Sequence, residues 1–144
     1  METAVVVAVI SGIVAVTTPG FAFYLTKAKE RDADRQKRKF EQYQEFLAAT
    51  GGIVGTDATP QGQRRFAAAC NTLSLMASVR VIRALHEYQD EIRVSNPHKS
   101  DERHDALFSK LVWEIRKDLR IRGTPRRAED FSVGLWCSGT GPLR

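Results

Sequence analysis

Hydrophobic and polar positions divide the chain into three parts. Residues 4–25 contain no charged side chain, and most of them are apolar. Residues 27–39 contain no apolar residue larger than alanine. From Phe40 onward, apolar residues recur at intervals of three and four, which is the spacing of one face of an α-helix. The pattern predicts an all-α protein with an apolar segment, a charged stalk and a bundle of amphipathic helices.

Four amphipathic segments make up the predicted bundle, residues 40–122. The first starts at Phe40 and stops at the glycines of "GGIVG". The second follows Thr59 and Pro60, which suit the cap and first position of a helix. The third and fourth follow Ser78 and Ser100, and Gly123 is expected to end the fourth. Short connections between such segments favour a four-helix bundle.

Two further features complete the predicted bundle. In the third segment, Glu87, Asp90 and Glu91 are expected on the solvent face. Cys70 falls on an apolar face, where a reduced and packed thiol is expected. After residue 122, the tail (residues 123–144) alternates apolar residues with a period of two, at Phe131, Val133, Leu135 and Cys137. This alternation predicts an extended arm, lying either on the bundle or on a partner.

The apolar segment is expected to be a transmembrane helix within residues 1–26. A membrane span needs about 20 apolar residues. A cleaved signal peptide would carry a base before a shorter apolar stretch, whereas Met-Glu-Thr carries none. Bases follow the segment and one acid precedes it, so the positive-inside rule places the N-terminus outside. We therefore expect an uncleaved signal anchor in the inner (plasma) membrane, single-pass, with the C-terminal domain in the cytoplasm.

Small residues within this segment indicate self-association. They recur at alternating steps of four and three, and such a stripe lets two membrane helices pack closely. A stripe arising by chance in a segment rich in alanine and glycine is the alternative. The small positions, with Gly12 forming an additional small-xxx-small pair with Ala8, are Ala4, Ala8, Ser11, Gly12, Ala15, Thr18 and Ala22.

The net charge of +5 is concentrated after the apolar segment. The stalk, residues 27–39, holds seven bases and three acids, whereas residues 40–122 hold twelve bases and eleven acids. The stalk either binds anionic lipid headgroups or only sets the topology. The near-neutral bundle argues against a nucleic-acid partner. The candidate headgroup-binding residues are Lys27, Lys29, Arg31, Arg35, Lys37, Arg38 and Lys39.

One set of residues could hold a metal. His86, the adjacent pair His104 and Asp105, and Asp118 resemble the metal ligands of HD-type phosphohydrolases, which activate water at phosphate. Their intervals of 18 and 13 residues are shorter than that family's. A solvated start of a helix at "SDERHD" is the competing interpretation. No catalytic residue, metal or cofactor is therefore expected, and the metal-dependent phosphohydrolase is kept as the alternative.

The segments "RKFEQYQEFLAA", "RRFAAACNTLSLMASVRVIRALHEYQDEIR" and "WEIRKDL" resemble an arrangement in small bacterial single-pass membrane proteins. Those proteins have an N-terminal span, a charged stalk and a short cytoplasmic helical domain. The resemblance implies this architecture and supplies no functional residue. The sequence as a whole predicts an interaction module that self-associates in the bilayer. We expect it to contact an unidentified protein partner, as an accessory, regulatory or effector subunit.

Overall fold

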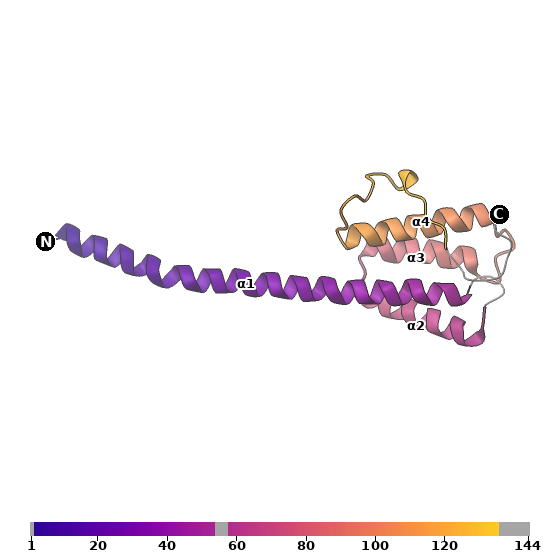
Figure 1. Ribbon diagram of the computed structural model, residues 1–144, viewed down its shortest axis with the longest axis horizontal. Coiled ribbons are helices and arrows are strands. Elements are labelled where there is room, and N and C mark those ends of the chain that lie inside the picture. Colours follow the sequence, from indigo (N-terminus) through magenta and orange to yellow (C-terminus); the bar gives the residue numbers. More distant parts are fainter. Residues whose placement is uncertain (1, 54–57, 136–144) are drawn as a thin grey trace. The chain divides into compact units, whose positions relative to one another are not determined.

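The computed structural model describes the backbone of residues 2–53 and 58–135, and the side chains from residue 23 onward within these ranges (Figure 1). Helices account for all regular structure in these ranges, which confirms the all-α prediction for them. In chain order the elements are α1 (Glu2–Thr50), the 3-10 turn η1 (Gly51–Ile53), α2 (Pro60–Met76), α3 (Val79–Ile92), α4 (Asp101–Asp118) and the 3-10 turn η3 (Ala128–Asp130).

Backbone contacts divide the chain into two units, residues 1–38 and residues 39–144. Helix α1 runs through the boundary, so its last turns belong to the second unit. No helix is both long and apolar enough to cross a membrane within the residues whose side chains are described. Residues 4–22, which hold all the small positions singled out above, lie outside the described side chains.

The second unit is a helical bundle with one hydrophobic core. Each of its four helices buries the face that the sequence periodicity indicates, and the free Cys70 thiol is buried among these side chains. The core consists of Tyr43, Phe46 and Ala49 from α1; Phe66, Ala69, Cys70 and Leu73 from α2; Val81, Ala84, Leu85 and Tyr88 from α3; and Phe108, Leu111 and Ile115 from α4.

Phe40 differs from its expected place in the core. Its side chain is 47% exposed, and Tyr43 is the first buried residue of α1. Lys39, which pairs with Asp118, is only 18% exposed, so the face of α1 that meets the bundle runs through Lys39 and Tyr43 at i,i+4 and leaves Phe40 at its edge. Helical periodicity predicts which face of a helix is apolar. The neighbouring helices decide how many residues of that face are buried.

Local signals set the starts of α2 and α4 as predicted. The Thr59 hydroxyl accepts a hydrogen bond from the Gly62 N–H at 3.0 Å, and Pro60 is the first residue of α2. The Ser100 hydroxyl accepts from the Arg103 N–H at 3.4 Å. Gly62 has a second role, because a Cβ atom there would lie 2.2 Å from the carbonyl oxygen of Gly52. The two glycines therefore let α2 approach the end of α1 closely.

The end of α4 lies earlier in the chain than predicted. The helix stops at Asp118 rather than at Gly123. The Ile121 N–H donates to the Arg116 carbonyl at 2.9 Å, and the Arg120 N–H donates to the Lys117 carbonyl at 3.0 Å. This pair of hydrogen bonds defines a Schellman motif. Its left-handed residue is Arg120, with φ 55°, so the position that usually favours glycine holds an arginine.

The extended arm lies on the bundle. The Ser109 hydroxyl donates to the Val133 carbonyl and accepts from the Val133 N–H, both at 3.0 Å. Val133 and Leu135 pack against the core, and the Trp113 indole N–H donates to the Pro125 carbonyl at 2.9 Å. Of the two arrangements that the alternation predicts, Val133 and Leu135 show the one in which the arm lies on the bundle. Cys137 lies outside the described residues.

Candidate functional site

A polar cluster joins α1 to the end of α4. The Asp118 carboxylate accepts a hydrogen bond from the Tyr43 hydroxyl at 2.5 Å and forms an ion pair with the Lys39 ammonium at 3.0 Å. The Lys39 and Asp118 side chains are only 18% and 11% exposed. Lys39, one of the candidate headgroup-binding residues, therefore directs its ammonium to Asp118 within the bundle.

This cluster shifts the titration of two groups. Burial and the hydrogen bond to Asp118 raise the pKa of the Tyr43 hydroxyl well above its usual range. Burial works to raise the pKa of Asp118, but the hydrogen bonds from Tyr43 and Lys39 and the Lys39 charge outweigh it and lower that pKa. The pair is therefore held as a neutral phenol beside a carboxylate anion, an arrangement that ties two helices together.

The opposite end of the bundle holds a buried carboxylate. Glu91, at the end of α3, is 5% exposed, although the sequence pattern predicts it on the solvent face. Its carboxylate accepts hydrogen bonds from the Ser100 N–H at 2.9 Å and from the Asn96 amide at 3.4 Å, and it pairs with Arg103 at 3.2 Å. These donors come from the α3–α4 connection and the first turn of α4, which fold back over it.

A small pocket of about 210 Å³ lies beside Glu91, lined also by Ile53, Ile92, Lys99 and His104. Typical small-molecule sites enclose about 300–1,000 Å³. The Glu91 oxygens that reach it are already occupied by donors from the protein. The pocket therefore offers little to a ligand beyond a partly apolar recess.

His104 is fixed at this pocket by two side chains. Its Nε2 lies 3.0 Å from the Tyr88 hydroxyl, and its Nδ1 lies 3.1 Å from the Asp105 carboxylate. Tyr88 is fully buried, whereas the Asp105 side chain is 66% exposed. The imidazole is therefore oriented by a core phenol on one side and a surface carboxylate on the other.

The four residues of the proposed metal set do not converge. His104 and Asp105 are in contact, but His86 is exposed on α3. Asp118 follows His104 by fourteen residues on α4, which separates them by about 21 Å along the helix. Among the described residues, no group of three or more His, Cys, Asp or Glu side chains is placed to hold a metal ion. The phosphohydrolase alternative therefore receives no support from the geometry.

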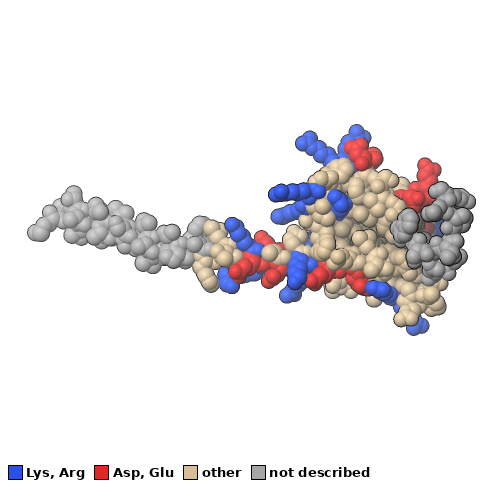
Figure 2. All heavy atoms as spheres, in the orientation of Figure 1, with Lys and Arg blue, Asp and Glu red and all other residues tan. Residues whose placement is uncertain are grey.

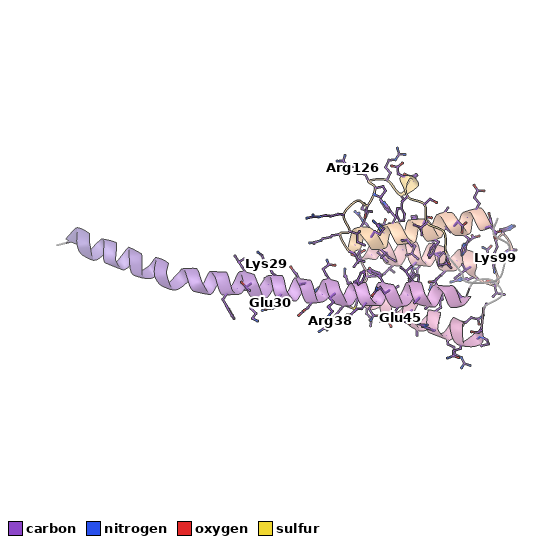
Figure 3. The ribbon with its side chains drawn as sticks, viewed as in Figure 1. Lys29, Glu30, Arg38, Glu45, Lys99 and Arg126 are labelled. Atoms are coloured by element: carbon purple, nitrogen blue, oxygen red, sulfur yellow. The ribbon has the colours of Figure 1, made fainter. Side chains whose placement is uncertain are left out.

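The remaining stalk bases are solvent-exposed along α1, where Figure 3 labels Lys29, Glu30 and Arg38. Lys27 pairs with Glu30 at 2.8 Å, one helical turn away. Both side chains are about half exposed, so this pair contributes little to stability. The charge of the stalk is therefore exposed to the surroundings and contributes little to ion pairs within the protein.

A second basic cluster escaped the sequence analysis. Residues 116–127 hold six bases and one acid, Asp118. The acids Asp101, Glu102 and Asp105 lie at the start of α4, so summing the charge over residues 40–122 hides the segregation. Figure 2 shows Lys and Arg gathered where α4 ends. A count restricted to this short window of the sequence would have revealed the cluster.

The polar cluster around Asp118, the pocket beside Glu91 and the basic residues at the end of α4 are three chemical features that the structure brings out. All three lie in the bundle. The cluster and the pocket are built from residues on different helices, whereas the basic residues are gathered at the end of α4. No protein-family model, curated protein sequence or solved structure matches the chain.

Proposed function

We propose that the protein is a membrane-anchored helical interaction module. In this proposal residues 4–25 cross the inner membrane once, with the N-terminus outside and the bundle in the cytoplasm. The module acts through self-association in the bilayer and through contacts of its bundle with a protein partner. Its role is that of an accessory, regulatory or effector subunit of a membrane assembly.

The observation that carries the proposal is the length of the uncharged stretch in the sequence. Residues 4–25 contain no charged side chain, and the backbone of α1 is helical through them. A helical stretch of twenty-two uncharged, mostly apolar residues favours an apolar environment. A bilayer provides it, since about 20 such residues span the hydrocarbon.

The pattern of small residues limits where self-association occurs. The alternating steps of four and three that connect Ala4 to Ala22 continue to Leu25 and then reach Lys29, Asp32 and Gln36. Charged and polar residues at such positions disfavour a tight seam. Close packing is therefore confined to the apolar segment, and each copy presents its bundle separately.

Membrane anchoring is tested by alkaline carbonate extraction and flotation of the full chain. The expected result is a full-length protein that stays with the membranes and floats with the lipid. An intact-mass measurement establishes whether the apolar segment is retained. Recovery of the full-length or a shortened chain in the soluble fraction would overturn the anchor.

Self-association is tested by crosslinking in membranes. The variant with Ala8→Leu and Gly12→Leu places large side chains on the stripe, and we expect it to reduce the crosslinked dimer strongly, because small residues allow close approach. Val6→Leu is the control, since residue 6 falls on the opposite side of a helix from residue 8. Equal crosslinking of all three proteins would contradict association through this stripe.

A further inference from the structure

The bases at the end of α4 are largely unpaired. Lys117, Arg120, Arg122 and Arg126 are exposed. Within the part of the chain that the structure describes, no carboxylate pairs with any of these four side chains. Of the acids near the cluster, Asp118 is engaged by Lys39, and Glu129 pairs with Arg127 at 3.3 Å. The cluster therefore carries an uncompensated positive charge.

Several bases elsewhere on the bundle are neutralised by neighbours. Lys110 pairs with Glu87 at 2.6 Å and Arg65 pairs with Glu45 at 2.8 Å. The Arg103 guanidinium lies 3.2 Å from Glu91. Like charges gathered without partners repel one another and attract a polyanion. Because residues 116–127 hold six bases and one acid, the end of α4 is the place where the bundle would meet an anionic surface.

Exposed apolar side chains lie at the same end. Leu75 and Val79, which are 84% and 72% exposed, flank the turn between α2 and α3. The backbone of Ser78, in that turn, helps to lower the pKa of Asp118, which places the turn beside the end of α4. Phe40, next to Lys39, is 47% exposed. Bases combined with exposed apolar residues are typical of surfaces that lie on membranes, whereas single-stranded nucleic acids are bound by aromatic stacking platforms.

We propose that this end of the bundle, residues 116–127 together with Leu75 and Val79, binds anionic phospholipid headgroups of the membrane that anchors the chain. The inference rests on the proposed anchoring. Only the twelve residues 27–38 connect the apolar segment to the bundle, so anchoring tethers the bundle within reach of the lipid surface. Tethering raises the effective concentration of that surface, and a weak electrostatic contact becomes sufficient.

The experiment uses the full chain reconstituted in phosphatidylcholine vesicles with or without phosphatidylserine. A fluorophore is attached at Val79→Cys, with Cys137→Ser removing the second reactive thiol and Cys70 left buried. Lipids carrying a nitroxide on the headgroup quench the fluorophore on contact. The same label at Val94→Cys is the positional control, because Val94 is 96% exposed and follows α3 at the other end of that helix.

The charge is tested with two matched variants. One carries Arg120→Gln, Arg122→Gln and Arg126→Gln. The other removes the same charge with Arg64→Gln, Arg93→Gln and Lys99→Gln. Figure 3 places Arg126 and Lys99 at opposite ends of the bundle. The first variant is expected to lower the ratio of membrane-bound to free bundle about fivefold for each base removed, and the second to leave it unchanged.

The expected result is quenching at residue 79 that requires phosphatidylserine, weakens in high salt and is absent at residue 94. Quenching that is equal at both positions, or independent of phosphatidylserine, would overturn the inference. Loss of quenching in both charge variants alike would also overturn it. If an oligonucleotide competes for this surface and still binds it in detergent, where no bilayer is present, the ligand of the surface is a nucleic acid and the inference is overturned. A chain that does not float with vesicles at all would instead refute the anchoring.

Discussion

The Asp118 carboxylate accepts a hydrogen bond from the Tyr43 hydroxyl at 2.5 Å, across 75 residues of sequence. The bond joins α1 to the end of α4, and the Lys39 ammonium completes it at 3.0 Å. It is therefore a tertiary contact, and its loss should lower the stability of the whole bundle rather than that of one helix.

Asp118→Asn is expected to destabilise the bundle by about 1–2 kcal/mol, because a charge-assisted hydrogen bond is lost and Lys39 loses its counterion. Chemical unfolding of the full chain in mild detergent measures the change. The control is Asp130→Asn, an exposed acid in the 3-10 turn η3. A stability equal to that of the wild type would show that the contact contributes nothing.

The same cluster predicts a pH dependence. The folded-state pKa of Asp118 is lowered from 3.8, so its contribution is present above that pH and is lost as the pH falls through the folded pKa. The folded-state pKa of Tyr43 is raised from 10.0, so its contribution is present below that pH and is lost as the pH rises further. Unfolding at graded pH should show the wild type and Asp118→Asn converging in acid. Tyr43→Phe should converge with the wild type in strong alkali.

Glu91→Ala is expected to cost about 2–3 kcal/mol, because the Ser100 N–H and the Asn96 amide lose a buried acceptor. The neighbouring Asp90 provides a matched control. Its pair with Arg93 is exposed on both sides, so Asp90→Ala should change stability by no more than about 0.5 kcal/mol. Thermal unfolding followed by circular dichroism compares the two, and equal effects would contradict the burial of Glu91.

Gly62→Ala is expected to destabilise the bundle by about 1–3 kcal/mol, because its methyl group would overlap the Gly52 carbonyl oxygen and force α2 away from the end of α1. Gly51→Ala is the control, since a Cβ atom there meets no other atom within 4 Å. Denaturant midpoints of the two variants test the close approach. The idea fails if the two substitutions cost the same.

Arg120→Gly is expected to stabilise the bundle by up to about 1 kcal/mol, because glycine adopts the left-handed backbone of the Schellman motif without a steric penalty. Arg122→Gly removes the same side chain two residues later, where the backbone φ is not positive. That substitution should be neutral or destabilising. A shift of the unfolding midpoint in the same direction for both variants would argue against strain at Arg120.

Local sequence signals were sufficient for the starts of α2 and α4 and for the buried faces of the bundle helices. The starts of α2 and α4 follow from Thr59, Pro60 and Ser100, whose capping interactions reach only three residues along the chain. The buried faces follow from apolar residues at helical spacing, as Phe66, Cys70 and Leu73 illustrate in α2. Interactions of such short range are encoded in consecutive residues, so a single sequence is enough to predict them.

Only the tertiary structure decided which residues depart from the burial and contacts that the helical pattern predicts. Glu91 is buried because Ser100, nine residues later, turns back to donate to it. Lys39 is largely buried because Asp118, on another helix, pairs with it, whereas the neighbouring Phe40 is 47% exposed. The metal set is dispersed because His104 and Asp118 occupy opposite ends of one helix. The sequence by itself therefore determined the helices and their apolar faces, whereas the partner of each polar group and the end of the bundle at which charge gathers depended on how those helices pack.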